Sequence, residues 1–197
     1  ANAQVDGRWC LVHATHLNAL ELQAIVQSCA VVGLCPITEA NLGDGVFPMQ
    51  ALAVAGGRFA VGSDSNVLID AAEELRLLEY GQRLTLQARN VLAQGTVSSG
   101  CWLYAQAAAG AMQALGVAQT GICAGASADL IELDTAHPAL VGRSDDALLD
   151  SWIFATRGTA VRNVWRCGRW VVRDGQHVDR ARIAKRFASV LRTLLGN

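Results

Sequence analysis

The sequence of 197 residues predicts an α/β fold, in which consecutive βα units are followed by antiparallel strands and a C-terminal helix. Three short apolar runs, at residues 9–12, 30–35 and 58–61, each end in polar or ionisable residues, and segments of helical periodicity separate them. Beyond residue 121, apolar and polar residues alternate as in half-buried strands. Because the parallel strands of βα units end at one edge of their sheet, we expect an active site at that edge.

The first two units have clear helix signals. A strand ends at His13, and Asn18 is a suitable N-cap for a helix over residues 18–29, whose apolar face comprises Leu22, Ile25, Val26 and Cys29. The strand at 30–35 leads into a polar, glycine-rich stretch, TEANLGDG at 38–45, which we expect to be a loop. Pro48 then opens a helix that ends before Gly56.

The third strand places Asp64 at its carboxyl end, in the segment RFAVGSDSNV. An aspartate in this position can bind a divalent metal, transfer a proton or cap the next helix, and the residues alone leave these alternatives open. His13 ends its own strand in the same way. The two ionisable side chains can therefore converge at one edge of the sheet.

The remaining elements are predicted from periodicity and turn residues. Helices are expected at 71–90, with an interruption at Gly81, at 101–115 and at 179–195. Strands are expected at 128–134, 151–155, 161–165 and 169–172, and a tight turn at Cys167-Gly168 joins the last two. The final helix combines an apolar stripe with a basic face that we expect to be solvated.

Composition and charge limit the function classes. Hydrophobic residues make up 52% of the chain, and the net charge of −1 offers no basic surface for nucleic acid or an anionic membrane. The longest apolar runs fall short of the roughly 20 residues that span a bilayer. The six cysteines are scattered without a metal-ligand spacing, so we expect small core residues in a reducing, cytoplasmic compartment.

The length does not accommodate a complete barrel. A closed (β/α)8 barrel of the TIM type needs about 250 residues, whereas only three βα units precede the antiparallel segment. The chain also starts at Ala1-Asn2, without a methionine. We therefore expect the carboxyl-terminal part of a longer barrel.

Six segments carry a resemblance to one enzyme family. They are LVHATHL at 11–17, GLCPITEANLGDGVFP at 33–48, GSDSNV at 62–67, EELRLLEYGQRL at 73–84, HPALVGRSDDALLDSWIF at 137–154 and VWRCGRWVVRDGQHV at 164–178. In order, and over essentially the whole chain, they resemble the carboxyl-terminal half of the formimidoylglutamate deiminases, which belong to the amidohydrolase superfamily. The segments at 33–45 and 79–84 are the specific ones, since GSDS alone indicates only the superfamily.

The resemblance implies a fold and its divisions. Barrel strands six, seven and eight would end at His13, Pro36 and Asp64, and the antiparallel strands would belong to the small β-sandwich that flanks such barrels. The implied divisions are a barrel part at 1–120, a β-sandwich part at 121–178 and a C-terminal helix at 179–197.

The resemblance also implies an activity, the hydrolysis of N-formimino-L-glutamate to N-formyl-L-glutamate and ammonia in histidine degradation, with one zinc ion (Zn2+) per active site. Asp64 matches a zinc ligand that carries the proton, and His13 matches a histidine that orients the attacking water without binding the metal. The family's other zinc ligands and its acid/base glutamate have no counterpart here. We therefore expect the isolated chain to be inactive, to need the missing N-terminal half as a partner, and to form a homodimer as its relatives commonly do.

Two other functions stay open. A related amidohydrolase could deaminate a purine or nucleoside, and a truncated chain could fold without metal or activity. Among the other polar residues, we expect His16 either to belong to a loop or to support a site residue from behind, and we expect structural roles for His137 and His177. Glu39 and Asn41 either contact substrate or satisfy the turns of their loop.

Overall fold

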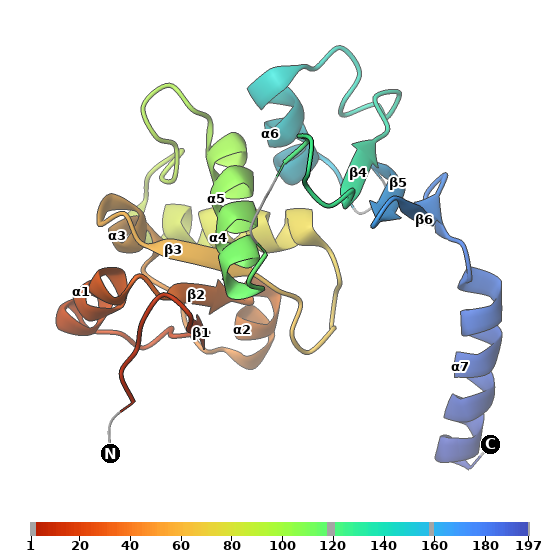
Figure 1. The fold of residues 1–197 in the computed structure, drawn as a ribbon, viewed down its shortest axis with the longest axis horizontal. Coiled ribbons are helices and arrows are strands. Elements are labelled where there is room, and N and C mark those ends of the chain that lie inside the picture. Colours follow the sequence, from red (N-terminus) through yellow and green to blue (C-terminus); the bar gives the residue numbers. More distant parts are fainter. Residues whose placement is uncertain (1–2, 118–120, 158–159, 197) are drawn as a thin grey trace.

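The computed structural model describes residues 3–117, 121–157 and 160–196 and has an α/β architecture with two separate sheets (Figure 1). Its elements are β1 (Cys10–Val12), α1 (Ala19–Ser28), β2 (Val31–Leu34), α2 (Pro36–Leu42), α3 (Met49–Val54), β3 (Arg58–Val61), α4 (Ala71–Leu86), α5 (Ser99–Ala114), β4 (Leu130–Leu133), α6 (Asp145–Ala155), β5 (Val161–Arg166), β6 (Arg169–Arg173), β7 (Gln176–His177) and α7 (Arg180–Leu195). Ala1-Asn2 and residues 118–120, where the expected boundary after the barrel part falls, lie outside the described residues.

The first sheet is parallel, in the order β1-β2-β3, as the βα pattern predicts. The register pairs Cys10 with Val31 and Val31 with Arg58, so the carboxyl ends of the three strands lie at one edge. In the central strand, Val31 and Leu34 are completely buried. A nearly continuous apolar run of this kind is typical of a parallel strand that is covered on both faces.

Helix α5 packs on this sheet, chiefly against β3. Gly110 makes the close approach possible, because a Cβ atom at this position would lie 1.8 Å from the carbonyl oxygen of Phe59. The Phe59 ring, which is buried, also contacts Trp102 of α5 with ring centroids 5.8 Å apart. A larger residue at position 110 would therefore push α5 away from the sheet.

In this part of the chain, local sequence signals predict the start of helix α1 correctly but not the course of helix α4. Helix α1 begins at the predicted cap: the Asn18 side chain accepts hydrogen bonds from the amides of Leu20 and Glu21, and the Glu21 carboxylate accepts one from the Asn18 amide. Helix α4 is continuous through Gly81, so the expected interruption is wrong, and it ends at Leu86 rather than at residue 90. The glycine at position 81 leaves room for the Val46 side chain, and it does not break the helix.

The strand expected at 151–155 is wrong, because these residues form the second half of helix α6. Leu148, Leu149, Trp152 and Ile153 recur at helical spacing, and Trp152 and Ile153 are buried. Helix α6 packs against α4 and α5. Contacts with these two helices, rather than the alternation within a five-residue window, decide the conformation.

The second sheet is antiparallel, in the order β4-β5-β6-β7. The predicted turn between β5 and β6 is present, and both Cys167 and Gly168 have a positive φ, as a two-residue hairpin turn of type I′ requires. Strand β7 was not predicted, because it comprises only two residues.

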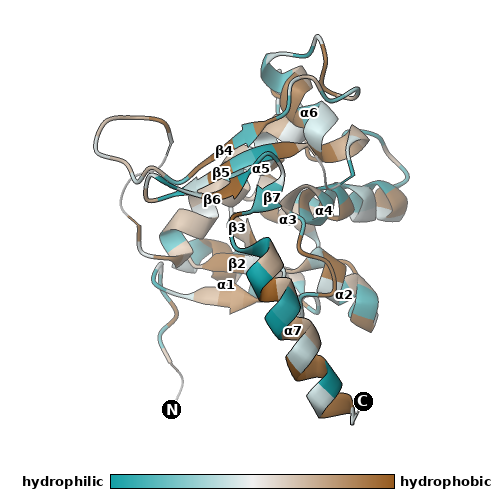
Figure 2. Ribbon diagram, turned by 90° about the vertical axis from the view of Figure 1, so that its right-hand side faces the viewer, coloured by the Kyte–Doolittle hydropathy of each residue, from teal (hydrophilic) through white to brown (hydrophobic). Residues whose placement is uncertain are grey.

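Helix α7 extends away from the rest of the chain, and apolar and polar residues alternate along it (Figure 2). None of its residues is buried, so the apolar stripe is as exposed as the basic face. Within the described ranges, no helix is both long and apolar enough to cross a membrane.

Arg76 links α4 to the end of α6 and supports a stability prediction. Its guanidinium donates hydrogen bonds to the carbonyl oxygens of Ile153, at 2.6 Å, and Thr156, and it pairs with Glu73. The substitution Arg76→Met leaves these carbonyls without their charged donor and should lower the free energy of unfolding by about 2–3 kcal/mol. Urea denaturation measures this loss, and Arg89→Met, at an exposed position, is the control. Equal unfolding free energies for the two variants would contradict the prediction.

Candidate active site

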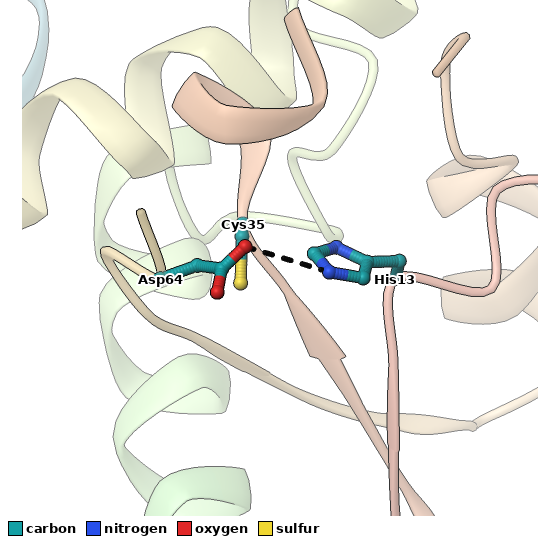
Figure 3. A group of neighbouring side chains, drawn as sticks. All are labelled: His13, Cys35 and Asp64. Atoms are coloured by element: carbon teal, nitrogen blue, oxygen red, sulfur yellow. Dashed lines mark ion pairs between the residues drawn. The ribbon is translucent and has the colours of Figure 1, made fainter. Parts of the chain in front are cut away.

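Three side chains with metal-binding or proton-transferring groups meet at the carboxyl edge of the parallel sheet. His13 follows β1, Cys35 follows β2, and Asp64 lies three residues beyond the end of β3. One nitrogen, one sulfur and one oxygen ligand atom of these residues lie within 4.8 Å of one another (Figure 3). The sheet therefore brings together the two predicted site residues, His13 and Asp64, and adds a third that was not predicted.

His13 is held by the backbone of the neighbouring strand. Its amide donates a hydrogen bond of 2.8 Å to the carbonyl oxygen of Gly33, which extends the β1-β2 ladder by one residue. The Nε2 atom of the ring lies 3.5 Å from Oδ2 of Asp64. With 36% of the His13 side chain and 42% of the Asp64 side chain exposed, both groups can reach a small molecule from solvent.

The backbone at both residues lies in the left-handed region, with φ of 67° at His13 and 40° at Asp64. Non-glycine residues adopt this conformation uncommonly and at a cost, and they cluster at functional sites. The loop of Asp64 is fixed to α2, because the Thr38 and Ser65 hydroxyls are 2.9 Å apart and the Ser65 amide donates to the Thr38 hydroxyl. Gly62 also donates to the carbonyl oxygen of Leu34, which joins the ends of β3 and β2.

Cys35 is the buried member of the group. Burial first, and then the negative charges of Asp64, Glu39 and Glu74, raise the pKa of its thiol to about 11. The thiol is therefore protonated at neutral pH unless a cation displaces the proton.

The expectation that all six cysteines are core residues is wrong: Cys35 is buried and Cys101 half-buried, whereas Cys10, Cys29, Cys123 and Cys167 are exposed. The signal for Cys35 was its position immediately after a strand, the same position that His13 occupies.

Glu39 and Asn41 lie in a helix and not in a loop, which corrects the prediction for residues 38–45. Helix α2 spans Pro36–Leu42 and ends at Gly43, whose φ of 75° is the left-handed cap. Asn41 is exposed on this helix, whereas Glu39 is buried. The Glu39 carboxylate contacts His13, with Oε1 3.2 Å from Nδ1 of the ring.

The other three histidines do not belong to this group. His16 is exposed. His137 and His177 each accept a backbone hydrogen bond two residues along the chain, from Ala139 and Asp179. These bonds stabilise local turns, in keeping with the structural roles expected for the two residues.

Comparison with known proteins places the chain in a family, because the amidohydrolase family model matches residues 3–171. The chain belongs to the amidohydrolase family. It is 49% identical over 195 residues to the formimidoylglutamate deiminase of Pseudomonas aeruginosa, covering 98% of this chain and 43% of that protein. It is also 33% identical to a 5-methylthioadenosine/S-adenosylhomocysteine deaminase of Halobacterium salinarum, over 83% of this chain and 37% of that protein. The amidohydrolase chain thus spans less than half the length of these relatives.

Solved structures agree with the family assignment. An amidohydrolase from Brucella melitensis superposes with a TM-score of 0.92 at 46% identity, over 98% of this chain and 42% of that chain. A zinc-bound adenosine deaminase from Xanthomonas campestris superposes with a TM-score of 0.80 over 96% of this chain and 44% of that chain, at 24% identity, and so supports the fold.

The donor set of this amidohydrolase is chemically suited to a divalent metal. Histidine nitrogen, cysteine sulfur and carboxylate oxygen are the three ligand types that zinc takes in proteins. The Asp64 carboxylate is exposed enough to bind an ion and still has a second oxygen for proton transfer. The arrangement can therefore combine metal binding with acid–base chemistry.

Glu74, on α4, accepts a hydrogen bond from the first turn of α2, and its burial leads to a prediction about pH. Its Oε2 accepts a hydrogen bond of 2.9 Å from the Ile37 amide, while Oε1 is buried without a partner among the described residues. Burial raises the pKa of Glu74 from 4.5 to about 7, with a smaller contribution from the charges of nearby carboxylates.

Because the folded-state pKa of Glu74 is raised, the protonated form stabilises the fold, and this contribution declines as pH rises from 4.5 to about 7. The decline should be roughly 3 kcal/mol at most. Glu74→Gln, which cannot ionise, should not show it, so the stability difference between wild type and variant should change over this pH interval. Urea denaturation at several pH values measures the difference, and parallel curves would contradict the prediction.

Proposed function

We propose that this chain supplies part of the active site of a zinc-dependent deiminase that hydrolyses N-formimino-L-glutamate to N-formyl-L-glutamate and ammonia in histidine degradation. The observation that carries the proposal is the convergence of His13 and Asp64, 3.5 Å apart, in a chain that is 49% identical to a formimidoylglutamate deiminase. A zinc ligand that carries protons and a histidine that orients water need this proximity. The specific segment at 33–45 lines the same edge through Cys35 and Glu39.

The proposed function requires a complete barrel, whose other strands lie outside this chain. The parallel sheet has two outer strands, β1 and β3, and each has one edge without a partner strand among the described residues. Strand edges with free amides and carbonyls pair with further strands, and a barrel closes by such pairing. We assign β1, β2 and β3 to barrel strands six to eight, β4–β7 to the flanking β-sandwich, and the missing strands to the N-terminal part that the longer relatives contain. The completed protein would be a cytoplasmic homodimer.

The residues of this chain have separate tasks in the proposed reaction. When bound, zinc lowers the pKa of a water molecule to roughly 7 and so supplies a nucleophile at neutral pH. Asp64 would hold the metal with one oxygen, and its carboxylate would take a proton from the water and return it to the nitrogen that leaves as ammonia. His13 would accept a hydrogen bond from the water and stabilise charge in the tetrahedral intermediate.

Mutations separate metal binding from water orientation in the protein that combines this chain with the rest of its barrel. Asp64→Asn should abolish both zinc retention and ammonia release. His13→Gln should retain zinc and lower kcat by about 10²- to 10⁴-fold, because an acid–base or orienting group is lost. Metal analysis and a coupled ammonia assay measure both properties. His16→Gln, in the same segment but exposed, is the matched control and should keep both.

Loss of zinc in His13→Gln would contradict the division of tasks, because it would make His13 a ligand. Full activity of Asp64→Asn would contradict the proposed function. The isolated chain is expected to release no ammonia, and activity without the other strands would show that they are not needed.

A second candidate function is the deamination of an adenosine derivative, which the 33% identity to a 5-methylthioadenosine/S-adenosylhomocysteine deaminase favours. A substrate panel decides between the two candidates. We expect kcat/KM for N-formimino-L-glutamate to exceed that for 5-methylthioadenosine, S-adenosylhomocysteine and guanine by at least about 10²-fold, since a site built for one polar substrate rejects unmatched ones strongly. The reverse order would assign the chain to the nucleoside deaminases.

A further inference from the structure

Glu39 is a buried carboxylate that neither binds metal nor faces open solvent in the proposed reaction. It lies on α2, one turn after Cys35, and only 4% of its surface is exposed. Its Oε1 atom lies 3.2 Å from Nδ1 of His13 and 2.8 Å from the amide nitrogen of Cys35. The side chain therefore reaches back from the helix to the ends of both β1 and β2.

The two contacts of Oε1 limit where the protons of Glu39 and of the His13 ring can lie. A backbone amide can only donate, so Oε1 acts as an acceptor toward Cys35. When Oε1 itself carries no proton, it can only accept from His13 as well, so Nδ1 of the ring carries a hydrogen. In the neutral ring the remaining nitrogen, Nε2, is then an unprotonated acceptor.

The unprotonated nitrogen faces the second carboxylate of the site. Nε2 lies 3.5 Å from Oδ2 of Asp64, so in the neutral ring with a hydrogen on Nδ1 two acceptors face each other. Acceptors in this arrangement repel unless a donor or a cation lies between them or against both. A water molecule that gives one hydrogen bond to each group fits this requirement and would be the nucleophile of the proposed reaction.

We propose that Glu39 is the positioning residue that fixes His13 in the Nδ1–H tautomer, so that Nε2 accepts a hydrogen bond from the attacking water. The effect of this role on catalysis rests on the proposed function, whereas the tautomer of His13 does not. Histidines at metal sites commonly donate their second ring N–H to a carboxylate, which sets ring orientation and basicity. Here the same device would act on a histidine that orients water instead of binding metal.

The tautomer can be measured directly in the protein that combines this chain with the rest of its barrel. Long-range ¹H–¹⁵N correlation spectra of ¹⁵N-histidine-labelled protein distinguish protonated from unprotonated ring nitrogens at alkaline pH, where imidazoles are neutral. His13→Gln identifies the signal of His13 among the histidines of the combined protein, four of which lie in this chain. We expect Nδ1–H in the wild type, Nδ1–H in Glu39→Gln, which keeps an oxygen acceptor, and loss of the Nδ1–H form in Glu39→Leu.

Kinetics test the consequence for catalysis. Glu39→Leu should lower kcat by about 10- to 100-fold, as the loss of outer partners of site histidines does, with little change in KM, and Glu39→Gln should recover most of kcat. Glu74→Leu is the matched control, because it also removes a buried carboxylate that accepts an α2 backbone amide, that of Ile37, but it does not contact His13. It should lose stability and keep both the tautomer and most of kcat.

Three results would overturn the proposal: Nε2–H as the His13 tautomer in the wild type, an unchanged tautomer in Glu39→Leu, or equal losses of kcat in Glu39→Leu and Glu74→Leu. The first of these results is measured on the wild type, so the proposal can be tested even if Glu39→Leu folds poorly. If the tautomer depends on Glu39 but no deiminase activity is found, the proposed function fails while the positioning role stands.

Discussion

Parallel pairing of β1, β2 and β3 is the constraint on which the site depends. Hydrogen bonds between the strands align their carboxyl ends, and two further bonds, from the amides of His13 and Gly62, extend the alignment into the loops. Each candidate side chain follows its strand within three residues, and the register together with the turns at the strand ends brings His13 and Asp64, which are 51 positions apart, to within 3.5 Å of each other. Phe59 and Leu34 are buried in the core beneath this edge.

Buried carboxylates form a second layer behind the site. Glu39 and Glu74 both accept backbone amides at the start of α2, those of Cys35 and Ile37. Amides at a helix start have no partner within the helix, so a carboxylate that accepts from them satisfies a buried donor and is itself stabilised. The two residues differ in what else they contact: Glu39 reaches His13, whereas Glu74 keeps one oxygen without a partner among the described residues. Glu39 thus contacts a candidate site residue, whereas Glu74 does not share this contact.

Local signals predicted most of the parallel part of the fold. The Asn18 cap, the helix spacing that follows it and the apolar runs at 30–35 and 58–61 are properties of short segments, and the structure agrees with them. Predictions failed where distant contacts decide. Residues 151–155 alternate over five positions but fold as a helix that packs against α4 and α5. Helix α4 continues through Gly81, where the absence of a side chain leaves room for Val46.

The sequence by itself predicted the family, from six segments along the chain, and it made His13 and Asp64 candidate site residues because each follows a short apolar strand. Only the tertiary structure decided that Cys35 joins them and that Glu39 contacts His13. Residues 34–45 read as a strand end and a polar loop, and nothing within that segment indicates which side chains point toward a different strand. That direction is set by the winding of α2 back over the sheet edge, where Glu39 finds a ring nitrogen and a backbone amide to bind.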